Sequence, residues 1–254
     1  MPQQTRRTEG RWPKVGHGTS LWAVGTTLLL LIVLGGFPTA TSPPTTSSAH
    51  RLPALQEDPL TQYRAFRRMH ATSERFNQEA WLDAWTEFDA DGFRYQIVSE
   101  RGSDGVLDRV LKPLLKREQE LVARGDDGRA GLTLSNYEFE DAADKGDGLR
   151  YVLIKPKRKD VLLVDGRMVL SQDGRELLRV EGRLSKNPSF WTSLVNVIRQ
   201  FERRDGVRVP VSTETIAKVK LAGLSRLEQH YEYESINGRP VSLYARQLAS
   251  DRTR

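Results

Sequence analysis

Apolar and polar side chains alternate along several long stretches of this chain. The clearest stretch runs from Val207 to Leu221, where valine, threonine, alanine and leucine occupy every second position. Charged and hydroxyl side chains, such as Glu214 and Lys218, occupy the positions between them. Successive side chains leave opposite faces of a β-strand, so this period of two predicts a half-buried strand. A strand of that length favours a strongly curved antiparallel sheet.

The same alternation, interrupted by reverse-turn dipeptides, predicts further strands. A strand at Glu79–Asp89 and its partner from Phe93 to Ile97 are expected to form a hairpin around Asp91-Gly92. Turn residues separate the other expected strands, which are 70–77, 136–140, 149–155, 160–165, 167–171, 176–185, 191–203, 207–221 and 227–234. This order contains no internal repeat.

Two stretches have a helical period instead. Asp58 can cap a helix that begins at Pro59 and ends near Arg68. Apolar residues recur at helical spacing over Asp104–Arg124, where Pro113 is expected to kink or divide the helix. A curved sheet needs a cover on its concave face. We therefore predict a mainly β (α+β) fold: a curved antiparallel sheet forming an open or half β-barrel, covered by the N-terminal helix and the helical insertion.

The first 49 residues have the composition of an export signal. Basic residues precede the uncharged apolar segment Leu21–Phe37, and a Pro/Thr/Ser-rich spacer follows it. We expect residues 1–49 to be a signal peptide with cleavage before His50. Retention of the apolar segment as a membrane anchor is the alternative, because its length is at the short limit for a membrane span. Residues 50–254 are expected to form a single domain.

Composition and motifs exclude several classes of function. The chain has no cysteine, so an exported form has neither disulfides nor a cysteine that could carry a lipid anchor. The net charge is +6, but residues 1–49 contribute four basic residues and one acidic residue, which leaves +3 for the remainder. That modest surplus is spread along the chain and gives no reason to expect nucleic-acid binding. Histidine spacing fits no metal site, and nucleophile-elbow, phosphate-loop and dinucleotide motifs are missing. We therefore expect a monomer that is not an enzyme and has no metal or cofactor.

Four features of the predicted layout occur together: an N-terminal helix before the first long strands, the helical insertion Asp104–Arg124, the hairpin segment Asp160–Leu170, and the long strands joined at Asp205-Gly206. This layout resembles the bacterial outer-membrane lipoprotein-carrier superfamily, which has LolA- and LolB-like folds. The resemblance covers roughly residues 55–240 and includes no invariant motif. It implies a periplasmic protein of a Gram-negative bacterium, an unclosed barrel with helices in its mouth, and a hydrophobic ligand such as a lipid or acyl chain. The superfamily has no catalytic residues to transfer.

Aromatic and leucine side chains are the candidates for a ligand-binding surface. Trp81 and Trp85 alternate with carboxylates on one face of their strand, and large rings supply extensive apolar contact area. On the concave side they would line a cavity beneath the helical insertion, and the alternative is that they are ordinary core residues beneath the helices. The predicted cavity lining consists of Trp81, Trp85, Phe93, Tyr95, Trp191, Leu111 and Leu114.

Two functions fit these observations. The first is an exported periplasmic carrier of a lipid or a lipoprotein acyl chain, and the resemblance favours it. The second is a structural or sensory envelope module that is tethered through Leu21–Phe37. Such a module would bind a membrane or envelope protein through a sheet edge or through the basic loop Lys155–Lys159. A hydrolase with an unrecognised site is the least supported alternative.

Overall fold

The computed structural model describes residues 58–143, 145–190, 192–220 and 223–241. Its helical segment comprises α1 Asp104–Val106, the π-helical turn η2 Leu107–Leu111, α2 Lys112–Ala123 and the short 3-10 turn η3 Asp127–Ala130. The strands are β1 Tyr63–Ser73, β2 Gln78–Asp89, β3 Gly92–Gly102, β4 Tyr137–Asp141, β5 Leu149–Pro156, β6 Val164–Ser171, β7 Leu177–Leu184, β8 Thr192–Arg204, β9 Val207–Val219, β10 Gly223–Ile236 and β11 Arg239–Pro240.

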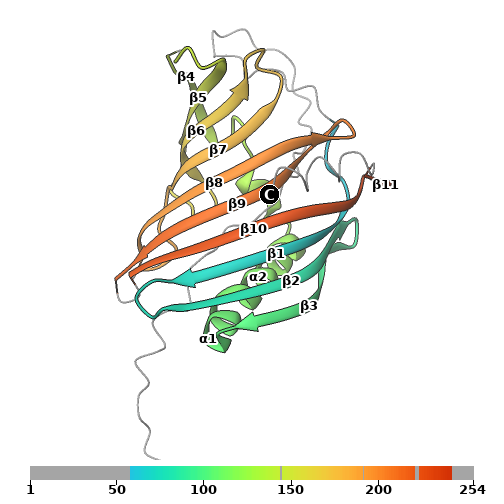
Figure 1. Ribbon diagram of the computed structural model, residues 1–254. Coiled ribbons are helices and arrows are strands. Elements are labelled where there is room, and N and C mark those ends of the chain that lie inside the picture. Colours follow the sequence, from blue (N-terminus) through green and yellow to red (C-terminus); the bar gives the residue numbers. More distant parts are fainter. Residues whose placement is uncertain (1–57, 144, 191, 221–222, 242–254) are drawn as a thin grey trace, which may run out of the picture.

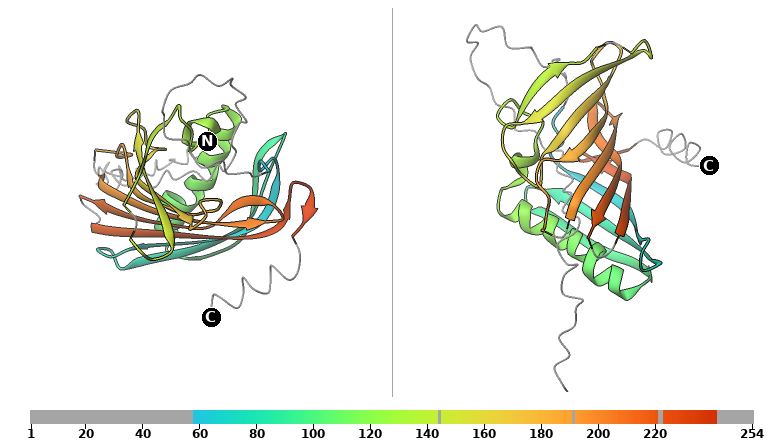
Figure 2. Two further views of the ribbon diagram at one scale, coloured as in Figure 1. Left: turned by 90° about the horizontal axis from the view of Figure 1, so that it is seen from above. Right: turned by 90° about the vertical axis from the view of Figure 1, so that its left-hand side faces the viewer.

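These strands form one curved antiparallel sheet. Its order is β3-β2-β1-β10-β9-β8-β7-β6-β5-β4, and the short β11 pairs with β10. β3 and β4 are consecutive in the sequence but lie at opposite edges, so the sheet does not close into a barrel (Figure 1). The helical segment connects these edges and lies inside the curve of the sheet (Figure 2). The predicted mainly β fold, with an open curved sheet covered by a helical insertion, is confirmed.

The predicted N-terminal helix is wrong, because this part of the chain is a strand. β1 pairs with β2 on one side and with β10 on the other, which satisfies its backbone within the sheet. Its buried residues alternate with more exposed ones and include Tyr63, Ala65, Arg67 and Met69. This period of two follows from the pleat of the strand, and the tertiary pairing outweighs the helix-capping pattern at the start of the segment.

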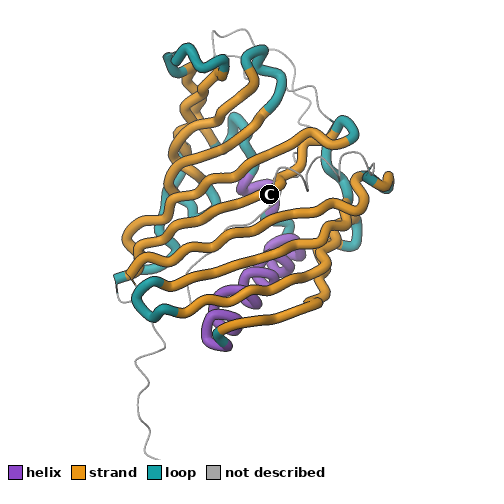
Figure 3. The backbone as a smooth tube through the Cα atoms, in the orientation of Figure 1, coloured by secondary structure: helices purple, strands orange, loops and turns teal. Residues whose placement is uncertain are grey.

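The helical insertion is confirmed as one continuous helical segment, and Pro113 changes its hydrogen-bond pattern without splitting it into two helices. Proline has no N–H to donate to the carbonyl of Arg109, and its ring pushes that carbonyl away. The turn before Pro113 is accordingly π-helical, and regular α-helix starts at Lys112. Gly125 ends the helix with a φ of 68°, and its N–H donates to the carbonyl of Val122 at 2.9 Å. Figure 3 shows the helical segment on one side of the strands.

Most of the predicted strands are present, but the hairpin predicted at Gly166 is wrong. Residues 160–163 form a turn, and Gly166 lies inside the continuous strand β6. Gly166 is paired with Gly182 of β7, and a Cβ added to either glycine would collide with the backbone of the opposite strand. Gly166 therefore permits a close approach of two strands in a curved part of the sheet.

Gly166→Ala is expected to lower the free energy of unfolding by about 1–3 kcal/mol, because the added methyl forces the paired strands apart. Gly105→Ala is the matched control, since a Cβ there makes ordinary contacts at 3.6 Å and longer. We expect that control to be neutral or stabilising, because alanine is the better helix former. Urea unfolding measures both changes. Equal midpoints for Gly166→Ala and the unmodified protein would contradict the proposed close approach.

The concave side of the sheet holds two hydrophobic core clusters. One lies between the helical segment and β1, β2, β3 and β10, and includes Met69, Leu82 and Leu115. The other lies over β4–β9 and includes Ile154 and Val197. Within the described ranges, no helix has the length and apolar character needed to span a membrane. The predicted signal segment, its cleavage site and the proposed domain boundary lie outside the described residues.

Candidate functional site

Trp81 and Trp85 lie on the outer face of the sheet, opposite to the helical segment. The residues of β2 that are buried against the helices include Leu82 and Ala84, which are 0% exposed. Alternation along the strand therefore places both tryptophans on the other face, where they are partly exposed. The expectation that the two rings lie beneath the helices, as a cavity lining or as core, is wrong.

The outer-face aromatic rings contact one another across β1 and β2. Trp81 stacks on His70 with ring centroids 4.5 Å apart, and Trp85 contacts Phe66 edge-on at 5.2 Å. The guanidinium of Arg64 lies 4.7 Å from the centre of the Trp85 ring. These contacts follow directly from the register of the strands, which places each pair of rings opposite one another.

The other predicted lining residues have different positions. Phe93, Leu111 and Leu114 are buried together between the sheet and the helices, and Tyr95 packs against them while partly exposed. Leu111 is 0% exposed, so these side chains pack as core in this state. Trp191 lies outside the described residues. The structure thus brings four of the seven predicted residues together and separates both tryptophans from them.

Polar side chains occupy the middle of the concave face, between the two core clusters. Gln229 of β10 is paired with Thr213 of β9, which is in turn paired with Arg199 of β8. Arg67 of β1 is paired with Tyr231 of β10, which lies two residues after Gln229 and on the same face of the sheet. We call the following residues the central polar cluster: Arg67, Glu118, Arg199, Thr213, Thr215 and Gln229.

Apolar side chains continue this row across the sheet on both sides of the cluster. Met69 and Leu82 extend it over β1 and β2. Val180, Met168 and Val152 extend it over β7, β6 and β5. All five side chains are buried. The concave face therefore has a polar centre with an apolar surface on each side.

Three buried, uncharged side chains of the central polar cluster have unused hydrogen-bonding groups. Thr213 and Gln229 are 1% exposed, and Thr215 is 0% exposed. Among the residues that the structure describes, the Oγ1 atoms of both threonines and Nε2 of Gln229 have no hydrogen-bond partner. Buried polar groups in proteins are nearly always paired, so such a concentration needs a specific explanation.

Arg67 and Glu118 form a buried ion pair between β1 and α2. The guanidinium donates to both carboxylate oxygens, at 2.6 Å from Nη1 and 3.1 Å from Nη2. The two side chains are 0% and 2% exposed. The guanidinium also lies 4.7 Å from the centre of the Tyr231 ring and 5.5 Å from that of Phe93. This arrangement is bidentate and shielded from water, so it fixes the position of α2 over the sheet.

Burial strongly affects the ionisation of the groups around this ion pair. It raises the pKa of Tyr63, Tyr231 and Tyr233 above the ordinary tyrosine value, so all three are neutral. Burial opposes the charged form of Arg67, but the attraction of Glu118 raises the pKa of Arg67 overall. In contrast, burial lowers the pKa of Arg199. Arg199 therefore holds its positive charge in a less favourable environment than Arg67 does.

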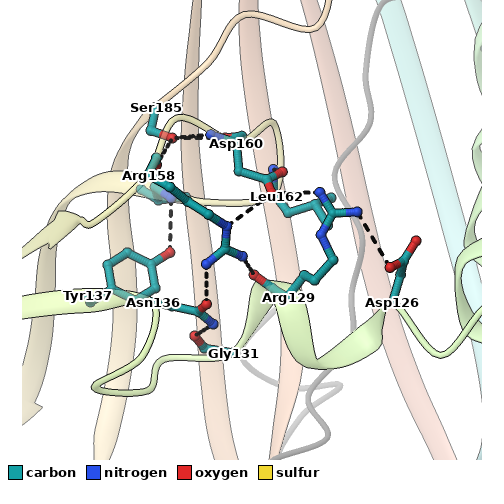
Figure 4. Close-up of polar contacts among 10 residues, drawn as sticks. Asp126, Arg129, Gly131, Asn136, Tyr137, Arg158, Asp160, Leu162 and Ser185 are labelled. Carbon is teal, nitrogen blue, oxygen red and sulfur yellow. Dashed lines mark hydrogen bonds and ion pairs between the residues drawn. The ribbon is translucent and has the colours of Figure 1, made fainter.

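A second polar network holds the connection after α2 against the connection between β5 and β6 (Figure 4). Asp160, whose side chain is 6% exposed, accepts a hydrogen bond from Arg129 at 2.8 Å and one from the Leu162 N–H at 3.1 Å. Arg158 lies 3.5 Å from the same carboxylate and donates to Asn136. These groups are mutually satisfied, which indicates a structural role. Arg158 of the predicted basic loop belongs to this network.

Asp160 is expected to make stability depend on pH below about 4, the usual pKa of an unfolded aspartate. Burial alone raises the pKa of Asp160, but the hydrogen bonds from Arg129 and Leu162 and the nearby arginines lower it overall. A lowered folded-state pKa contributes stability above the unfolded pKa, and this contribution is lost as the pH falls through the folded value. Asp160→Asn should therefore flatten the acid limb of a stability–pH curve.

At pH 7, Asp160→Asn should lower the free energy of unfolding by about 1–3 kcal/mol, because it removes a charged hydrogen-bond acceptor. Asp141→Asn is the control, since Asp141 pairs with Arg150 at the surface, where ion pairs contribute about 0–1 kcal/mol. Thermal unfolding between pH 3 and 7 measures both. An unchanged acid limb in Asp160→Asn would assign the pH dependence to other carboxylates.

Comparisons with known proteins include a distant structural similarity. No family model matches the chain, and no curated protein matches it. Among solved structures, a DUF1329 family protein from Desulfovibrio piger aligns over 69% of this chain and 85% of its own, with a TM-score of 0.31 and 11% identity. Similarity at this level carries no information about function, which has to be inferred from the residues of this chain. No group of three or more metal-ligating side chains occurs among the described residues.

Sequence reasoning missed the central polar cluster. Thr213 and Thr215 were placed correctly on the buried face of their strand, but threonine is common in strands and did not stand out. Arg67 and Glu118 are separated by 51 residues, and Arg67 was assigned to a helix. One pattern in the sequence could have indicated the cluster: Arg67 and Gln229 are polar residues at every-second positions that are otherwise apolar or aromatic, between Ala65 and Met69 and between Leu227 and Tyr231.

Proposed function

We propose that this protein is an exported periplasmic carrier, and not an enzyme, that binds a lipid or lipoprotein acyl chain on the concave face of its sheet. The open sheet and its helical cover support this proposal, because the lipoprotein-carrier superfamily that the sequence resembles has an unclosed barrel with helices in its mouth. The concave face also offers apolar side chains on both sides of the central polar cluster, including Met69 and Val180. Such an arrangement matches an amphiphile better than a fully polar substrate.

The observation that carries the proposal is the buried ion pair between Arg67 and Glu118. The interface between α2 and the sheet is packed, with Leu111 and Leu115 at 0% exposure, so an acyl chain can enter beneath α2 only if α2 moves. A buried ion pair contributes little net stability compared with a well-packed apolar pair, because burial removes both charges from water. Both charges regain water when α2 moves away. The ion pair therefore suits a cover that must open.

Native mass spectrometry of the protein purified from its own compartment, followed by organic extraction, tests the proposal. We expect a bound acyl species at a near one-to-one ratio. We also expect the delipidated protein to take up a fluorescent acyl-chain probe. An empty protein that takes up no such probe would refute the carrier function.

The partly exposed aromatic rings of the outer face favour a second candidate, a tethered envelope module that binds a protein partner. Trp81 and Trp85 lie there beside arginine side chains, and aromatic residues and arginine are enriched in protein interfaces. The mass of the exported form separates the two candidates. Retention of Leu21–Phe37 in a protein without lipid supports the tethered module, and loss of residues 1–49 supports the carrier.

A further inference from the structure

The unused groups of the central polar cluster are hydrogen-bond donors or can act as donors. Nε2 of Gln229 is an amide donor, and its Oε1 already accepts from the hydroxyl of Tyr231 at 3.5 Å. The hydroxyls of Thr213 and Thr215 can each donate. Nε of Arg67, which its ion pair leaves unused, is a fourth donor among the described residues. These donors lie on neighbouring positions of one sheet face, and the chemical complement of several neighbouring donors is a group with several acceptor oxygens.

The charged residues of the cluster favour a negatively charged acceptor. The cluster contains two guanidinium groups, those of Arg67 and Arg199, and one carboxylate, that of Glu118. Both oxygens of this carboxylate already accept hydrogen bonds from Arg67. The aromatic groups that contact the cluster, such as Tyr231, are neutral. An anion is stabilised by such surroundings, whereas a second cation is not.

We propose that the ligand is an amphiphile with an anionic oxygen head group, a carboxylate or a phosphate, and that Thr213, Thr215 and Gln229 donate hydrogen bonds to this head. This inference rests on the proposed carrier function and names the ligand class for the same site. The acyl chain lies along the apolar row beside the cluster, toward Met69 or toward Val180. Ligand binding then satisfies the buried donors, which explains why the chain retains polar side chains where valine or methionine would pack.

A series of probes that share one alkyl chain separates this inference from the carrier function. The probes are a fatty acid, an alkyl phosphate, an alcohol and a methyl ester, each displacing a fluorescent acyl probe from the delipidated protein. We expect the acid or the phosphate to bind about tenfold more tightly than the alcohol and the ester. The tighter of the two anions identifies the source of the head group.

Each result of this series has a defined meaning. Equal binding of all four probes, or preference for an uncharged head, overturns the anionic head group and leaves the carrier function standing. No binding of any probe overturns the carrier function itself. A preference that grows as salt is lowered further supports recognition of an anion, because screening weakens charge attraction.

Matched substitutions test the residues. Thr213→Val combined with Gln229→Met removes two unused donors at nearly constant volume, so the preference for an anionic head should fall severalfold. The melting temperature of the free protein should change little or rise, because the hydrogen bond that is lost, from Tyr231 to Gln229, is long at 3.5 Å and therefore weak. Thr86→Val is the control: this buried hydroxyl donates to the carbonyl of Ala65 at 3.1 Å, so its loss should lower the melting temperature and retain the preference.

If the double variant instead melts at a lower temperature and keeps the preference for anions, the two side chains have a structural role only. That outcome overturns the assignment of Thr213 and Gln229 to the head group.

Discussion

Replacing Arg67 by methionine is expected to lower the free energy of unfolding by about 3–5 kcal/mol, because the carboxylate of Glu118 stays buried without its partner. The double variant Arg67→Met/Glu118→Met should recover most of this loss, since an apolar pair of similar volume replaces the ion pair. Urea unfolding of the two single variants and the double variant forms a double-mutant cycle. Additive losses in the double variant would show that the two residues do not act as a pair.

The same double variant is also expected to bind acyl probes more slowly than the unmodified protein. In this variant, the contact between positions 67 and 118 is entirely apolar. Moving α2 away from β1 then exposes apolar groups to water, and no charged groups gain hydration in return. Stopped-flow binding of a fluorescent acyl probe measures this rate. A stable double variant with an unchanged rate would show that ligand entry does not require α2 to separate from β1.

Leu115→Ala is expected to lower the free energy of unfolding by about 2–5 kcal/mol, because Leu115 is fully buried between α2 and the sheet and its truncation leaves a cavity. Hydrogen exchange should show faster local opening of α2. Leu134→Ala is the control for removing the same atoms at the surface, since Leu134 is 57% exposed. We expect that control to change stability by less than about 0.5 kcal/mol. Equal effects of the two substitutions would contradict the packing described for α2.

The sequence predicted the sheet and the helical insertion because both depend on local patterns. Alternation over Val207–Leu221 located β9, and the apolar helical period located the helical insertion. The N-terminal segment was mistaken for a helix because a capping pattern at Asp58 and Pro59 coincides with the start of β1. Pairing with β10, which is distant in sequence, decides its conformation, and a local pattern carries no information about that pairing.

The candidate site was harder to predict, because it depends on which face of each strand is concave. Trp81 and Trp85 attracted attention as large rings, but small residues such as Ala80 and Ala84 occupy the face beneath the helices. Alternation shows that the two sets lie on opposite faces and does not show which set the helices cover. The sequence can place Gln229 on the buried face of its strand. Only the structure shows that the amide nitrogen of Gln229 has no hydrogen-bond partner among the described residues.

The pairing of β1 with β10 has a consequence for how this chain folds. It joins Tyr63 to Ile236, so β1, β2 and β3 gain their connection to the rest of the sheet only when almost the whole chain is available. Contacts between such distant residues form slowly, because a long loop must close first. The pairing of β1 with β10 is therefore expected to be a late step in the folding of this chain.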